Sequence, residues 1–127
     1  MEDYVSFEIA QKLKENWFRE KCKLHYYDDT KDRYASSNPQ CYNYGGNTSD
    51  APTISHVLKW LRNEKKIHLC IDIYDDGWFF DISSFCKQDS GVYEVELPYK
   101  SSNVTPDYET YEQAALAGIE YILDYLI

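Results

Sequence analysis

The sequence predicts an α+β fold, in which a small antiparallel sheet of about three to five strands is covered on one face by three helices. Three segments carry apolar residues at the spacing of a helix, and segments between them alternate as strands do. Their order is helix, strand, loop, helix, three strands and helix. Strands that follow one another directly favour antiparallel pairing. The 127 residues are enough for a single domain, 1–127, with its own apolar core.

Each helix is predicted from an apolar stripe and a start signal. The first is expected at 7–18 after Ser6, the second after Thr53, and the third at about 111–126, where Thr110 begins a capping box. One side of each helix is apolar and therefore faces the core. The stripe residues are Phe7, Ala10, Leu13 and Trp17, then Ile54, Val57, Leu58 and Leu61, and finally Ala114, Ala115, Gly118, Ile119, Ile122, Leu123 and Leu126.

The clearest strand signal is the period of two over residues 67–84. Asp76-Gly77 is a typical type I′ turn sequence, and we expect it to form a two-residue loop between two strands. That register sets Asp72 opposite Asp81 on the outer face of the sheet. The residues expected to face the helices are Leu69, Ile71, Ile73, Phe80 and Ile82. Weaker alternation predicts further strands at 22–27 and 92–97.

Residues 35–52 are predicted to form a long polar loop, because turn-forming residues dominate and no period is visible. The tip has the Tyr/Asn/Gly composition of adaptable recognition surfaces. A Trp beside the stripe of the second helix adds an aromatic anchor. The predicted partner-binding residues are Tyr42, Asn43, Tyr44 and Trp60. The alternative is ordinary packing, with the tyrosines as loop anchors and the Trp partly buried.

A second set of candidate residues lies on the outer face of the predicted hairpin. Carboxylates held opposite each other repel, and acid–base or cation sites use such pairs. His68 lies on the same face but two pleat repeats away from Asp72. An enzyme of hydrolase type would therefore use His68, Asp72 and Asp81, whereas the alternative is a solvated sheet face.

Charge is unevenly distributed along the chain. The net charge is −9. Residues 1–66 contain ten acids and eleven bases, whereas residues 67–127 contain twelve acids and two bases. Because phosphate would be repelled, direct nucleic-acid binding is disfavoured, and mimicry of nucleic acid by the acidic half remains an alternative.

Cysteine spacing and the start of the chain indicate a reducing compartment. The four cysteines contain no C-x-x-C pair, so we expect free thiols and no metal site. The first twenty residues lack the features of a secretory signal, and no apolar run approaches the ~20 residues of a membrane span. We therefore expect a cytoplasmic protein that is not membrane-bound. No phosphate loop or cofactor motif is present, and we expect no cofactor.

Three blocks of the chain resemble small, uncharacterised proteins of bacterial phages and prophages. The blocks are Tyr4-Val5-Ser6-Phe7-Glu8-Ile9-Ala10, then 51–62 (Ala-Pro-Thr-Ile-Ser-His-Val-Leu-Lys-Trp-Leu-Arg), and 111–119 (Tyr-Glu-Gln-Ala-Ala-Leu-Ala-Gly-Ile). That family has no assigned activity, so the resemblance implies no catalytic residue. It implies a bacterial cytoplasmic or phage setting and an accessory role.

The sequence as a whole favours a non-catalytic module that binds another protein over an enzyme. No nucleophile elbow, metal cluster or acid–base pair at motif spacing is present. The features present are a Tyr/Asn/Gly loop, many aromatic residues and an uneven charge. A homodimer is left open.

Overall fold

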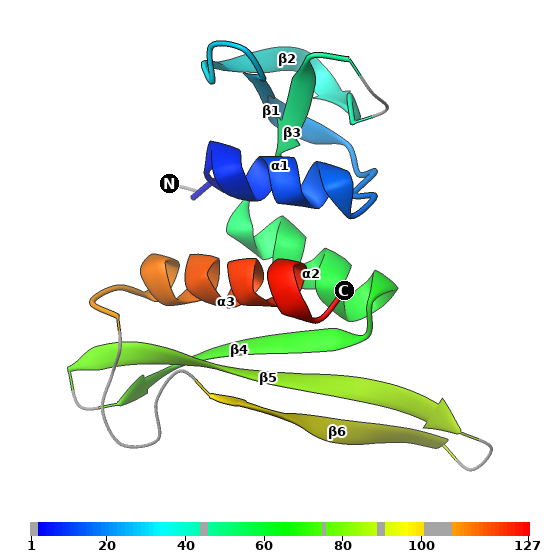
Figure 1. Cartoon of the computed structure of the whole chain (residues 1–127), viewed down its shortest axis with the longest axis vertical. Coiled ribbons are helices and arrows are strands. Elements are labelled where there is room, and N and C mark those ends of the chain that lie inside the picture. Colours follow the sequence, from blue (N-terminus) through cyan, green and yellow to red (C-terminus); the bar gives the residue numbers. More distant parts are fainter. Residues whose placement is uncertain (1–2, 44–45, 75, 89–90, 101–107) are drawn as a thin grey trace. The chain divides into compact units, whose positions relative to one another are not determined.

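The computed structural model describes residues 3–43, 46–74, 76–88, 91–100 and 108–127, with the backbone alone for residues 74, 84–88 and 91–100. This part of the chain is an α+β fold with three helices and two antiparallel sheets (Figure 1). The elements are α1 (Phe7–Glu15), β1 (Cys22–Tyr27), β2 (Arg33–Gln40), β3 (Thr48–Ala51), α2 (Ile54–Glu64), β4 (Ile67–Tyr74), β5 (Gly77–Gln88), β6 (Gly91–Lys100) and α3 (Tyr111–Tyr125).

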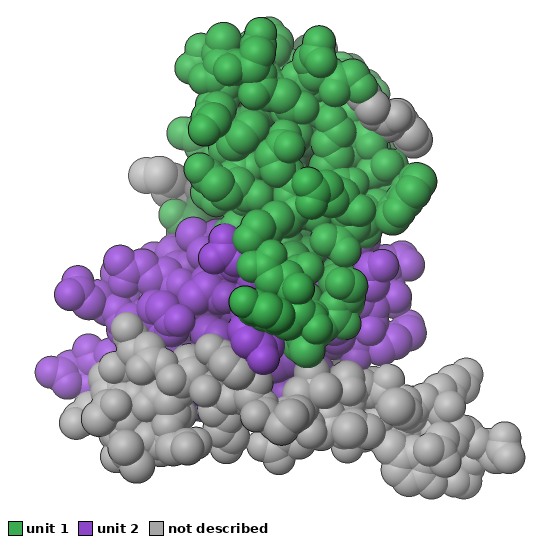
Figure 2. Space-filling view, in the orientation of Figure 1, with its two compact units in different colours: residues 1–54, 122–127 green, residues 55–121 purple. Residues whose placement is uncertain are grey.

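The strands form two sheets rather than the one that the sequence predicted. One has the order β2-β1-β3 and the other β4-β5-β6. The chain divides into two compact units, coloured green and purple in Figure 2. Unit 1 comprises residues 1–54 and 122–127, and unit 2 comprises residues 55–121. No helix in the described part of the chain is long and apolar enough to cross a membrane.

In unit 1, α1 packs against one face of the sheet β2-β1-β3. The ring of Tyr26 meets that of Phe7 edge-on, with centroids 5.5 Å apart, and the Tyr26 hydroxyl donates to the Val5 carbonyl at 2.8 Å. Since neighbouring residues of a strand point to opposite faces, His25 and Tyr27 lie on the other face. The buried apolar residues of unit 1 include Val5, Ile9, Ala10, Leu13, Phe18, Cys22, Tyr26 and Ala51.

The segment predicted as a loop, 35–52, contains most of β2 and all of β3. Both strands pair antiparallel with β1, which lies between them. The side chains of β2 are almost all exposed, so the strand has no alternation of apolar and polar residues to detect. Pairing with β1, and not local pattern, makes these residues a strand.

Helix α1 ends at Glu15, three residues before the predicted end. The amides of Trp17 and Phe18 turn back to the carbonyls of Lys14 and Leu13, at 3.3 and 3.0 Å, in the manner of a Schellman motif. Trp17 occupies the left-handed position of this motif, with a φ of 64°. It therefore does not continue the predicted apolar stripe, and its side chain is 75% exposed.

In unit 2, the hairpin β4–β5 has a different register from the predicted one. Tyr74 pairs with Gly77, so the loop lies one residue earlier than Asp76-Gly77. Asp81 lies opposite Cys70, and Asp72 lies opposite Phe79. The predicted Asp72–Asp81 pairing is therefore wrong. The apolar face is unchanged, because moving the loop by one residue slides each pairing by two positions, which preserves the side of every residue.

Helix α3 covers part of the apolar face of this hairpin. An added methyl group at Gly118 would lie 2.6 Å from a methyl carbon of Leu69 and 3.2 Å from the ring of Phe80, so helix and strands are in close contact there. Leu69, Phe80 and Ile82 are buried, whereas Ile73, near the loop, is 54% exposed. Ile73 lies on the predicted face but is not buried as predicted, because the apolar pattern of β4 extends beyond the buried part of the strand.

Candidate functional site

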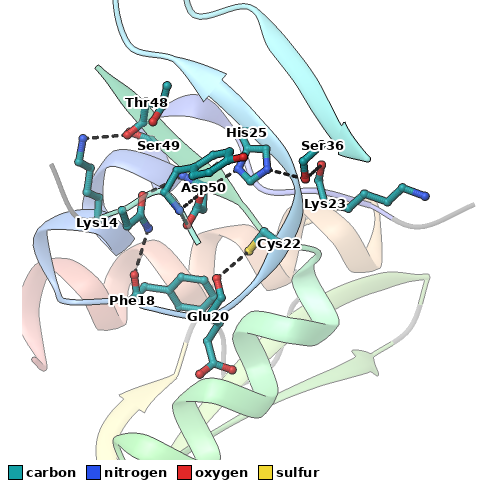
Figure 3. A network of polar contacts seen from close by, with 12 residues as sticks. Lys14, Phe18, Glu20, Cys22, Lys23, His25, Ser36, Thr48, Ser49 and Asp50 are labelled. Carbon is teal, nitrogen blue, oxygen red and sulfur yellow. Dashed lines mark hydrogen bonds and ion pairs between the residues drawn. The ribbon is translucent and has the colours of Figure 1, made fainter. Parts of the chain in front are cut away.

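Three polar side chains from three strands meet on the face of the sheet β2-β1-β3 that does not carry α1 (Figure 3). His25 of β1 lies between Asp50 of β3 and Ser36 of β2. The His25 Nδ1 and Asp50 Oδ1 atoms are 2.7 Å apart, and the His25 Nε2 and Ser36 Oγ atoms are 3.1 Å apart. Both His25 and Asp50 are 0% exposed. Ser36 is half-buried.

Tyr42 and Asn43, in the segment after β2, hold Asp50 in place. The Tyr42 amide donates to both of its oxygens, at 3.0 and 2.9 Å. The Asp50 amide in turn donates to Asn43 Oδ1 at 2.9 Å, and Asn43 Nδ2 donates to the Phe18 carbonyl at 3.1 Å. The Tyr42 amide and His25 therefore orient the carboxylate, while Asn43 fixes the Asp50 backbone, and a buried charge needs such partners.

The hydrogen bonds assign the role of each ring nitrogen of His25. A carboxylate only accepts, so Nδ1 carries a proton and donates it to Asp50. In the neutral ring Nε2 is then the acceptor, and the Ser36 hydroxyl donates to it. The other acceptor near that hydroxyl is the Lys23 carbonyl, at 3.4 Å. The shorter contact with Nε2 is the better hydrogen bond.

Tyrosine rings enclose the imidazole. The centroid of the His25 ring lies 4.6 Å from that of Tyr42 and 5.1 Å from that of Tyr34. Tyr27 stacks on Tyr34 with centroids 4.4 Å apart. Burial raises the pKa of Tyr34, partly offset by a hydrogen bond with Thr48. The row of rings packs on the imidazole and restricts its orientation.

Two thiols lie near the same carboxylate. Burial raises the pKa of Cys41, and a hydrogen bond to Asp50 is a further, smaller cause. Burial, followed by the negative charge of Asp50, raises the pKa of Cys22 far above its ordinary value. Both thiols and Cys70 are free, and Cys86 lies outside the residues whose side chains are described. Within the described residues, no three His, Cys, Asp or Glu side chains are grouped to hold a metal ion.

The structure separates the four predicted partner-binding residues. Tyr42 is exposed on one side and covers His25 with the other. Asn43 is buried, and its amide is used in the two hydrogen bonds that support Asp50. Trp60 is 5% exposed, which matches the alternative of a packed side chain. Tyr44 lies outside the described residues.

The three residues of the enzyme alternative lie on one face of the β4–β5 hairpin but not as one cluster. His68 pairs with Ser83, two residues along each strand from the Cys70–Asp81 pair. Asp72 is exposed and its Oδ1 accepts from the Ile73 amide at 2.8 Å. Asp81 has one buried oxygen with no hydrogen-bond partner among the described residues.

Trp17 is a residue of functional interest that the sequence pattern assigned to the core. Trp17 follows Leu13 by four residues and so fits the helical stripe. Helix α1 ends at Glu15, however, so Trp17 lies outside the helix and is exposed. The Arg19 guanidinium lies 4.9 Å from the centroid of the Trp17 ring. The bond between Asn43 Nδ2 and the Phe18 carbonyl brings the segments of Trp17 and Tyr42 together.

Comparisons with known proteins add no relative. No protein-family model matches the chain, and neither a curated protein nor a solved structure matches it.

Proposed function

We propose that the chain is a protein-binding accessory module, of the kind that the resemblance to phage proteins implies, and that Trp17 is the centre of its contact surface. The observation that supports this is the conformation of Trp17, a 75% exposed Trp at a left-handed backbone position. We call Trp17, Arg19 and Tyr42 the Trp17 surface.

The position of Trp17 is costly for stability in two ways. A left-handed conformation costs a residue with a Cβ about 1–2 kcal/mol, and this position of a Schellman motif is usually occupied by Gly. The large ring also remains in water instead of being buried. Lys31 and Lys66 share the positive φ, but they expose a charged group rather than an aromatic one. Strain retained at an exposed aromatic residue supports a role in binding.

The neighbours of Trp17 suit a contact with another protein. Trp, Tyr and Arg are the residues most enriched at binding hot spots, and the Trp17 surface contains one of each. Arg19 stacked over the ring adds a cation beside an apolar plane. Tyr42 is held by its backbone amide on Asp50, so its ring is ordered before any partner binds.

The variant Trp17→Gly separates binding from stability. Gly relieves the left-handed strain, so we expect the free energy of unfolding to stay constant or rise by up to about 1 kcal/mol. Affinity capture from a bacterial lysate, read by quantitative mass spectrometry, should lose the proteins that the wild-type chain retains. Tyr125→Ser is the matched control, because Tyr125 is 73% exposed and lies in the same unit.

Two results would contradict the proposal. Capture of the same proteins by wild type and Trp17→Gly would show that Trp17 makes no contact. Equal losses with Trp17→Gly and Tyr125→Ser would show that exposed aromatic residues bind without specificity.

A further inference from the structure

We propose that Ser36 is a nucleophile, activated by His25 and Asp50, that accepts the acyl group of a carboxylic ester. This activity goes beyond the binding function and rests on different residues. It follows from the order of the contacts: carboxylate to Nδ1 at 2.7 Å, and Nε2 to hydroxyl at 3.1 Å. A nucleophile within hydrogen-bond reach of a base that a third group orients is the arrangement of acyl-transfer sites on unrelated folds.

The base is prepared before any substrate binds. Asp50 is held by the Tyr42 amide on both oxygens, so it keeps Nδ1 protonated and directs Nε2 towards Ser36. The rings of Tyr34 and Tyr42 restrict rotation of the imidazole. Because His25 and Asp50 are fully buried, their mutual interaction is weakly screened, and the carboxylate stabilises the imidazolium that forms when the hydroxyl proton is taken.

The nucleophile remains accessible although the base is buried. Ser36 is half-buried and lies on β2, which is an edge strand with one neighbour, β1, in its sheet. An ester would approach the hydroxyl at the exposed part of the Ser36 side chain. His25 and Asp50 act from behind it, one as the general base and the other as the positioning residue.

The reaction balances with water as the only co-reactant. The Ser36 Oγ–H bond breaks as its proton moves to His25 Nε2, and a bond forms between Oγ and the carbonyl carbon. The ester C–O bond breaks, and the leaving alcohol takes the proton from Nε2. Water then releases the carboxylic acid through the same base. The proposed substrates are carboxylic esters, because an alcohol leaves more readily than the amine of an amide.

Labelling of the full-length protein with a fluorophosphonate tests the proposal. Ser36 Oγ should displace fluoride to form an Oγ–P bond, and peptide mapping by mass spectrometry should place one adduct on Ser36. Ser36→Ala should abolish that adduct. Ser37→Ala is the control and should label as the wild type does, since Ser37 is the neighbouring exposed residue of the same strand.

A second variant tests the activation of Ser36 rather than its presence. Asp50→Asn should slow labelling by roughly a hundredfold, because His25 is then no longer held as the base, and a positioned base contributes about 10²–10⁴-fold. Circular dichroism shows whether Asp50→Asn is folded. The comparison of Ser36→Ala with Ser37→Ala does not depend on this variant, so the proposal stays testable if Asp50→Asn misfolds. A folded wild-type protein without an adduct, or with an adduct that survives Ser36→Ala, overturns the proposal. Neither result bears on capture through Trp17.

Discussion

Cys22 is the most buried of the thiols that the structure describes, and its hydrogen bond runs to the Glu20 carbonyl at 3.6 Å. Burial, then the charge of Asp50, the neighbouring Cys41 and the charge of Glu20, raise its pKa from the ordinary 9.0. The unfolded chain therefore loses this thiol proton at a lower pH than the folded chain does. The stabilisation is complete below about pH 9 and is lost as the pH rises further.

We expect Cys22→Ala to weaken the alkaline loss of stability. A single group with a raised pKa contributes a slope of about 1.4 kcal/mol per pH unit at most, and the variant lacks that contribution. Urea unfolding at several pH values from neutral to alkaline measures the slope. The other groups whose pKa values burial raises should leave a residual slope in the variant; they are Cys41, Cys70, Tyr26 and Tyr34. Equal slopes in the two proteins would contradict this account.

The residues of the candidate site were not predictable from the sequence, and the reason is their separation. His25 is 11 residues from Ser36 and 25 from Asp50, with no local pattern linking them. They meet because β1 pairs on one side with β2 and on the other with β3. His25 alone reads as a scattered histidine, and its two partners lie in the segment whose composition predicted a loop. Tyr42 is a predicted contact residue because turn composition indicates exposure, and its role in binding stays a prediction.

At the level of elements, the face of a strand was easier to predict than its pairing. The alternation in β4 and β5 places Leu69, Phe80 and Ile82 on the buried side, as the structure confirms. The register depended on the turn alone, because a slip of two residues leaves the alternation intact. The Asp-Gly signal favoured the later loop, whereas Gly77 is the first residue of β5.

Two isoleucine-to-alanine substitutions test which part of the apolar face of the β4–β5 hairpin is buried. Ile82 is 1% exposed and Ile73 is 54% exposed, on the same face. Ile82→Ala should lower the free energy of unfolding by about 2–5 kcal/mol, as truncation of a buried side chain does. Ile73→Ala should change it by less than about 0.5 kcal/mol. Denaturant titration of both variants gives the comparison, and equal costs would contradict the burial of Ile82.

The contact of α3 with β4 and β5 predicts a cost for a substitution that favours helix formation. Gly118→Ala raises helix propensity by about 1 kcal/mol. The new methyl group would overlap Leu69, which is buried and has little room to move, and would press on Phe80. Overpacking of this kind costs about 1–3 kcal/mol, so we expect a net loss of stability by urea unfolding.

A double variant separates steric overlap from other causes. Leu69→Val removes bulk at the point of overlap. If overlap is the cause, Leu69→Val with Gly118→Ala should be more stable than the sum of the single changes predicts. Additive effects would contradict the steric explanation.

At the level of the whole molecule, the two units divide the charge differently from the two halves of the sequence. Unit 1 contains ten acids and seven bases, and unit 2 contains twelve acids and six bases. Both units are therefore acidic. The positive balance of residues 1–66 is not a property of a unit, because four of its bases, Lys59, Arg62, Lys65 and Lys66, belong to unit 2. This weakens the basis for assigning nucleic-acid mimicry to one half of the chain.

Both boundaries between the units fall within helices, since α2 begins at the last residue before one boundary and α3 continues past the other. Both α2 and α3 therefore have residues in each unit, so unfolding of one unit would break a helix of the other. We therefore expect one transition in differential scanning calorimetry, with equal calorimetric and van't Hoff enthalpies. Two resolved transitions would show that the units unfold independently.

The exposed position of Trp17 also gives the protein an intrinsic optical reporter. Of its three tryptophans, Trp17 is exposed to solvent, Trp60 is buried, and Trp78 has an intermediate exposure. Collisional quenching of the native fluorescence by iodide should therefore act mainly on Trp17, and the emission that remains should come mainly from Trp60. A ligand seated on Trp17 would shield that quenchable component, so its binding could be followed in the unlabelled protein.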